Sequence, residues 1–69
     1  MQKLSLEKLR EMYPSGTPIV LDEMYGESRM LAGLHGTVDF IDDASQIHVK
    51  WENGSSLAIV PEVDRFHKA

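Results

Sequence analysis

The sequence predicts a mainly β domain of about five strands, preceded by one short α-helix. An apolar stripe with helical spacing stops at Pro14, and short alternating runs rich in β-branched residues come after it. The pair Asn53-Gly54 separates two of these runs, as in a tight hairpin. A chain of 69 residues is expected to hold a single domain, residues 1–69.

The first expected element is a helix over residues 5–13. Ser5 is a favourable N-cap, because its hydroxyl can accept a hydrogen bond from an amide of the first turn. Glu7 would lie in that turn, where the helix dipole favours a negative charge. Pro14 cannot continue the helix, since it lacks the backbone N–H and its ring clashes with the preceding turn.

The remaining residues, 17–67, are expected to form the β part. Val38 and Phe40 alternate with Asp39 and Ile41, which predicts Val38 and Phe40 in the core. Short runs of this kind, bounded by turn residues, are typical of strands. They are expected at residues 19–21, 36–42, 46–51, 55–60 and 65–67, with a long loop at 25–35.

The order of these segments is that of an SH3-like barrel. A short strand, a long loop, a three-stranded meander, a tight turn and a last short strand follow one another. Closure of the sheet would hide the strand edges, and the helix would cover an open end. We expect Gly54 to supply the positive φ of a type I′ turn, and Gly36 to permit a tight start of its strand.

Composition argues against several classes of function. Hydrophobic residues make up 42% of the chain and charged residues 26%, as in ordinary folded domains. There is no cysteine, and the three histidines lack the spacing of a metal site, so neither a metal nor another cofactor is expected. No apolar run approaches the ~20 residues of a membrane span. The first residues lack the apolar core of a signal peptide, so the expected location is cytoplasmic.

The net charge is −4, with Lys and Arg numbering 7 against 11 Asp and Glu. Nucleic-acid binding gains affinity from basic residues that neutralise phosphates. Here the basic residues are scattered, so a nucleic acid or nucleotide is disfavoured and a protein partner is favoured. Self-association into a homo-oligomer stays open for so small a domain.

A candidate partner-binding patch comprises Tyr25, Arg29, Met30 and Trp51. The first three lie in the long loop, and loops on a rigid scaffold often carry function. Tyrosine and arginine are enriched in interface hot spots, and methionine adapts to varied partners. The alternative is structural, with Met30 and Leu31 tucked under the loop and Tyr25 capping the barrel. For Trp51, alternation with core-facing neighbours favours core packing over a ligand contact.

A second candidate is an acidic surface formed by Asp39, Asp42 and Asp43 on a predicted hairpin. Paired carboxylates can bind metals or exchange protons. These three lack the spaced ligands of a calcium loop, so a solvated hairpin is favoured and an electropositive partner is the alternative. The spacing of the histidines indicates no serine–histidine–aspartate arrangement, so neither catalytic residues nor enzymatic activity is predicted.

Five blocks of sequence carry a resemblance to a known family. They are Met12-Tyr13-Pro14-Ser15-Gly16-Thr17, Gly33-Leu34-His35-Gly36-Thr37-Val38, Ile41-Asp42-Asp43, Ile47-His48-Val49-Lys50-Trp51-Glu52-Asn53-Gly54-Ser55 and Pro61-Glu62-Val63-Asp64-Arg65-Phe66. Together they resemble an uncharacterised domain-of-unknown-function family of short proteins from phages and conjugative elements of Gram-positive bacteria. The resemblance implies an SH3-like fold and a mobile-element origin. It implies no site residues, because the family has no established activity.

The segment from Gly36 to Gly54 is also similar to an SH3-like motif of RNA- and ribosome-associated proteins. The leading hypothesis is nevertheless a non-enzymatic protein-binding module of a phage or other mobile element, an inhibitor or adaptor that acts on a host protein. The alternative is a small-ligand, nucleotide or nucleic-acid binder that uses the barrel face around Tyr25, Lys50 and Trp51.

Overall fold

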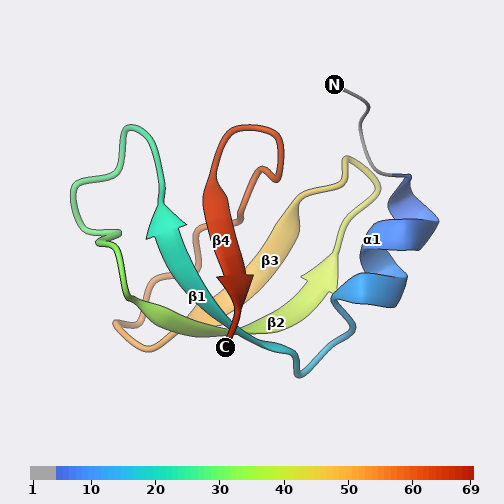
Figure 1. Ribbon diagram of the computed structural model, residues 1–69, viewed down its shortest axis with the longest axis horizontal. Helices are drawn as coiled ribbons and strands as arrows, with labels where there is room; N and C mark the ends of the chain where they lie inside the picture. Colours follow the sequence, from blue (N-terminus) through green and yellow to red (C-terminus); the bar gives the residue numbers. More distant parts are fainter. Residues whose placement is uncertain (1–4) are drawn as a thin grey trace.

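The computed structural model describes residues 5–69, which form one short helix and one antiparallel sheet of four strands (Figure 1). The elements are α1 (Leu6–Met12), β1 (Pro18–Glu23), β2 (His35–Ile41), β3 (Ile47–Trp51) and β4 (Arg65–Lys68). Their order in the sheet is β3-β2-β1-β4. Figure 1 shows a strongly bent sheet with α1 beside β2. The mainly β class and the short N-terminal helix are thus confirmed.

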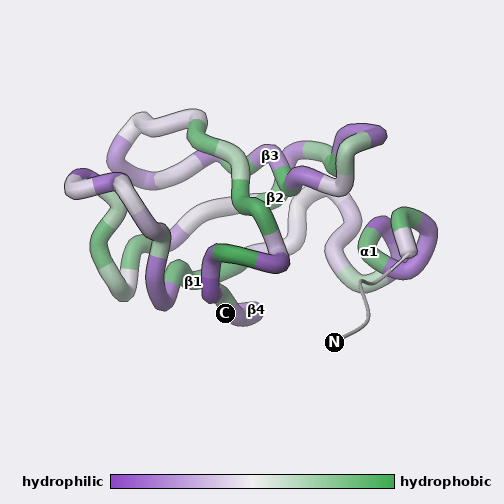
Figure 2. Tube along the Cα trace, turned by 90° about the horizontal axis from the view of Figure 1, so that it is seen from above, coloured by the Kyte–Doolittle hydropathy of each residue, from purple (hydrophilic) through white to green (hydrophobic). Residues whose placement is uncertain are grey.

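The helix begins and ends close to the predicted positions. The Ser5 hydroxyl accepts a hydrogen bond from the Lys8 N–H at 3.2 Å, as its N-cap role requires. The Tyr13 N–H donates to the Leu9 carbonyl at 2.9 Å, and Pro14 ends the helix there. Figure 2 shows hydrophobic and hydrophilic residues on different sides of α1. Its apolar side contributes Leu9 to the core.

The predicted strand at residues 55–60 is reduced to a single bridge. Ile47 and Ile59 exchange two backbone hydrogen bonds, of 2.9 and 2.8 Å. The Leu57 carbonyl accepts a hydrogen bond from the indole N–H of Trp51 at 2.8 Å, a side-chain contact in place of a regular ladder along β3. The sheet is therefore open and four-stranded, and a closed barrel of five strands is not confirmed.

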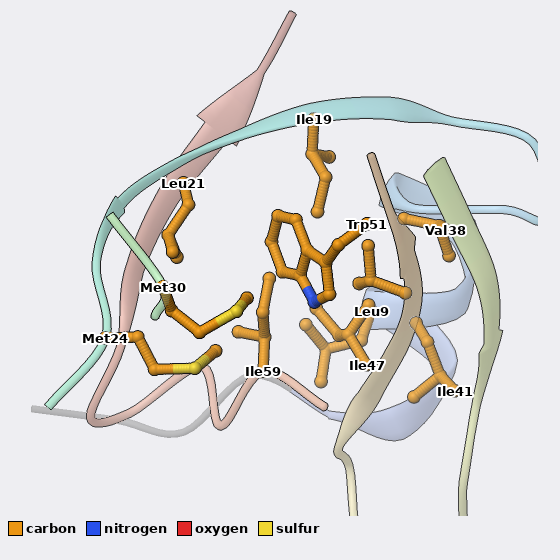
Figure 3. Close-up of a cluster of buried hydrophobic side chains, with 11 residues drawn as sticks. Leu9, Ile19, Leu21, Met24, Met30, Val38, Ile41, Ile47, Trp51 and Ile59 are labelled. Carbon is orange, nitrogen blue, oxygen red and sulfur yellow. The ribbon is translucent and has the colours of Figure 1, made fainter. Parts of the chain in front are cut away.

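The core lies on the inner side of the bent sheet, around Trp51 (Figure 3). Its buried members come from the helix, three strands, the long loop and the bridge segment: Leu9, Ile19, Leu21, Met24, Met30, Val38, Ile41, Ile47, Val49, Trp51 and Ile59. Gly36 lies directly under this tryptophan. A Cβ atom there would lie 2.5 Å from Val49 Cγ1 and 2.6 Å from Trp51 Cε3, so the close approach requires glycine.

A β-bulge in β2 reverses the predicted directions of Phe40 and Ile41. The register with β3 shifts between Val38 and Phe40, which leaves Asp39 as the extra residue. One extra residue moves every later side chain to the opposite face. Ile41 is consequently buried, whereas Phe40 is 52% exposed. The prediction of Phe40 as a core residue is wrong for this reason.

The turn after β3 also differs from the type I′ prediction. The Gly54 N–H donates to the Trp51 carbonyl at 3.0 Å, closing a β-turn around Glu52 and Asn53. Gly54 has φ of 84°, but Asn53 does not have positive φ, as a type I′ turn would require. The connection has the pattern of a three-residue hairpin loop, in which the glycine follows the turn.

Candidate functional site

The loop between β1 and β2, residues 24–34, combines two buried anchors with two exposed apolar side chains. Met24 and Met30 lie in the core. Tyr25 is 56% exposed and Leu31 is 69% exposed. Figure 3 shows both methionine side chains pointing into the core below Leu21. The loop therefore keeps a defined position although it has no regular secondary structure.

Polar contacts fix the backbone of this loop further. The Gly33 N–H donates to the Leu21 carbonyl at 2.7 Å, which extends the pairing of β1 and β2. The Asn53 side-chain amide donates to the Arg29 carbonyl at 3.4 Å and thereby joins the loop to the turn after β3. The Arg29 side chain itself is exposed.

Two of the four predicted partner-binding residues do not face solvent. Met30 is 3% exposed, and Trp51 is 4% exposed with its indole N–H bound to a backbone carbonyl. Their assignment to the contact surface is corrected, because both side chains are almost fully covered by the core. Tyr25 and Arg29 remain as exposed members of the predicted patch.

Asp42 organises the turn that joins β2 to β3. Its carboxylate accepts hydrogen bonds from the backbone N–H groups of Ala44 and Gln46, both at 3.0 Å, and from His48 Nε2 at 2.8 Å. The His48 bond, followed by the Gln46 bond, holds the pKa of the Asp42 carboxyl below its ordinary value, although partial burial opposes this. The Asp42 carboxylate therefore stabilises the turn and its hydrogen-bonding oxygens are already engaged there.

The other two predicted acidic residues have different environments. Asp43 is almost fully exposed, and its carboxylate lies 3.3 Å from the Arg10 guanidinium. Arg10 also donates to the Ile41 carbonyl at 3.0 Å. Asp39, at the bulge, is half-buried, and its carboxylate makes no hydrogen bond or ion pair within residues 5–69. The three aspartates thus do not form one acidic surface.

Phe40 and His48 form a stacked pair on the outer face of the sheet. Their ring centroids lie 4.3 Å apart and their planes differ by 5°. The two residues are cross-strand neighbours. The carboxylate of Asp42, which follows β2, is hydrogen-bonded to the His48 imidazole. Sequence reasoning missed this pair, because the bulge that exposes Phe40 has no local signal. The hairpin register would have revealed that the two residues face each other.

Two hollows flank Phe40, and Asp39 also lines both. The first, here the helix-side hollow, has a volume of about 220 Å³ and lies against Tyr13 and Pro14 at the end of α1. The second, the strand-side hollow, has a volume of about 360 Å³ and lies against β3 and residues 54–56, with Lys50 in its wall. An exposed aromatic residue between two depressions is suited to contact with another molecule.

Within residues 5–69, no group of three or more histidine and acidic residues could hold a metal ion. His67 is bound to Asp22 at 2.9 Å, across β4 and β1. In the same part of the chain, no helix is long and apolar enough to cross a membrane.

The chain matches a known family over nearly its whole length. Residues 2–69 match the family described as Domain of unknown function (DUF4314). No curated protein and no solved structure matches the chain. The expectation of an uncharacterised family is therefore confirmed.

Proposed function

We propose that this chain, which belongs to the family Domain of unknown function (DUF4314), is a non-enzymatic protein-binding module. One observation carries the proposal: Tyr25 and Leu31 stay exposed on a loop that Met24 and Met30 anchor in the core. Large exposed side chains on a rigid support are typical of interface hot spots. An anchored loop also loses little entropy when a partner binds.

The proposal includes an SH3-like architecture. Its support is the order of neighbours β4, β1, β2 and β3, followed by the bridge from Ile47 to Ile59. The predicted segments thus follow one another in space in the order expected for such a barrel, with the segment at residues 55–60 contributing a single pair. The bend of the sheet in Figure 1 is in keeping with this order.

The proposal also includes a biological role, as an inhibitor or adaptor that a phage or other mobile element directs at a host protein in the cytoplasm. This part rests on the resemblance of the sequence blocks to proteins of such elements. The net charge of −4 favours a partner with an electropositive surface.

The test compares the wild-type chain with the double variant Tyr25→Ala/Arg29→Ala. The immobilised wild-type chain is used to capture partners from host lysate, and the affinity for each partner is then measured by calorimetry. We expect the double variant to lose at least about 30-fold in affinity, as for hot-spot residues. Its melting temperature should stay within about 2 °C of wild type, since both side chains are exposed. Unchanged affinity would exclude this loop as the contact surface.

A nucleotide or nucleic acid is the second candidate ligand. Burial of Trp51 removes one aromatic residue on which this alternative relied. Phe40 and Lys50, which both line the strand-side hollow, are the groups that would stack on a base and contact a phosphate. A protein partner remains the better-supported candidate, because the basic residues are few and scattered.

A further inference from the structure

We propose that the helix-side hollow binds a cationic side chain, arginine or lysine, of a partner protein. The hollow lies between the end of α1 and β2 and is distinct from the loop between β1 and β2. Three kinds of observation support a cationic occupant. They are the aromatic walls, a carboxylate that has no partner among the described residues, and the hydrogen bonds of the nearest arginine to other groups.

The walls of the hollow contain two aromatic rings, Tyr13 and Phe40, together with Pro14. His48 stacks on Phe40 and still leaves this residue 52% exposed. Aromatic faces attract cations through the negative charge of their π-systems. The Tyr13 ring already has one such contact from outside the hollow, since the Lys68 ammonium lies 5.4 Å from its centroid.

Asp39 supplies the counter-charge. It is the one carboxylate in the wall of the hollow, and within residues 5–69 it has neither a hydrogen bond nor an ion pair. The β-bulge directs this residue beside Phe40 instead of into a regular ladder position. A half-buried carboxylate attracts a cation more strongly than one in bulk water, because the local dielectric constant is lower.

Arg10 also lines the hollow, but its charge is engaged elsewhere. Its guanidinium donates to the Ile41 carbonyl at 3.0 Å and to the Asp43 carboxylate at 3.3 Å. The strand-side hollow is less suited to a cation, because the exposed ammonium group of Lys50 lines it. The charge pattern therefore favours the helix-side hollow.

The test is an NMR titration of the ¹⁵N-labelled chain with the capped tripeptides Gly-Arg-Gly and Gly-Lys-Gly. Capped Gly-Glu-Gly and adenosine monophosphate serve as comparison probes. We expect saturable shifts of the Tyr13, Ser15 and Ile41 amides, which belong to this hollow and not to the strand-side one, with the cationic probes alone and with Kd on the order of millimolar. Asp39→Asn and Phe40→Leu should each weaken binding by about three- to tenfold.

Glu27→Gln is the matched control, because it removes the same charge from an exposed position outside the hollow. It should bind the cationic probes like the wild-type chain. The amide spectrum of each variant establishes that it is folded. The inference is wrong if Asp39→Asn leaves Kd unchanged, or if the glutamate peptide or the nucleotide saturates the same amides.

This inference rests on the proposed function only in taking the partner to be a protein. The titration needs no natural partner, and Tyr25→Ala/Arg29→Ala should bind the cationic tripeptides as the wild type does. Loss of the loop contact and loss of the cation site would therefore appear in different variants and different assays.

Discussion

The two faces of the hairpin formed by β2 and β3 are held together in different ways. On the inner face, Trp51 packs against Gly36 among buried apolar side chains (Figure 3). On the outer face, the Phe40–His48 stack and the carboxylate of Asp42 make partly exposed contacts. Folding should therefore depend mostly on the inner face, which leaves the outer face free to serve recognition.

The largest effect is expected from Gly36→Ala on the inner face. The new methyl group would lie 2.5 Å from Val49 and 2.6 Å from Trp51, and both side chains are buried. Overpacking of this kind should lower the free energy of unfolding by about 3 kcal/mol. Thermal unfolding is followed by the fluorescence of Trp51, which is the one tryptophan in the chain.

Gly54→Ala is a matched control for Gly36→Ala. Gly54 has φ of 84° and open space around its missing Cβ, so alanine adds backbone strain without a clash. Its cost should be about 1 kcal/mol. If the two glycine variants were equally stable, close packing of β2 under the tryptophan would not be the dominant constraint.

A smaller loss is expected from Trp51→Phe. The substitution removes the indole N–H that donates to the Leu57 carbonyl at 2.8 Å, and it leaves a cavity at the centre of the core. Together these effects should cost about 2 kcal/mol, measured by urea unfolding followed by circular dichroism. A loss below about 0.5 kcal/mol would contradict the central place assigned to this side chain.

On the outer face, Asp42→Asn should destabilise the chain in a pH-dependent way. The pKa of the Asp42 carboxyl is lowered in the folded chain, because the ionised form accepts hydrogen bonds from His48 and Gln46. Its contribution is therefore fully present above the unfolded pKa of about 4, and it is lost as pH falls through the lower folded value.

The measurement is the difference in melting temperature between the wild type and Asp42→Asn. This difference should be present at about pH 5 and should shrink as the pH falls through the lowered pKa of the Asp42 carboxyl. Asp43→Asn is the control, because this exposed carboxylate accepts no hydrogen bond from the turn backbone. A difference that did not change with pH would show that ionised Asp42 does not stabilise the turn.

The smallest effect on stability is expected from Phe40→Leu. Phe40 is 52% exposed, and the change removes the ring stacked on His48 while keeping an apolar side chain. The free energy of unfolding should fall by less than about 1 kcal/mol. A loss as large as that of Gly36→Ala would show that the outer face also determines folding.

Local sequence was enough to predict the class of fold and most of the inner face. Ser5 and Pro14 marked the ends of the helix, because capping and the missing proline N–H act within a few residues. The alternation of Ile47, Val49 and Trp51 predicted which face of β3 is buried. All three side chains are buried in the structure. The resemblance of the sequence blocks correctly indicated an uncharacterised family.

Long-range packing set the remaining features, and with them both candidate sites. The bulge at Asp39 depends on how β2 pairs with β3, so nothing in residues 36–42 alone could show that Phe40 turns outward. The burial of Met30 similarly depends on the space left between distant strands. Such choices are made by contacts between segments far apart in the chain, whereas periodicity and caps report only on neighbouring residues.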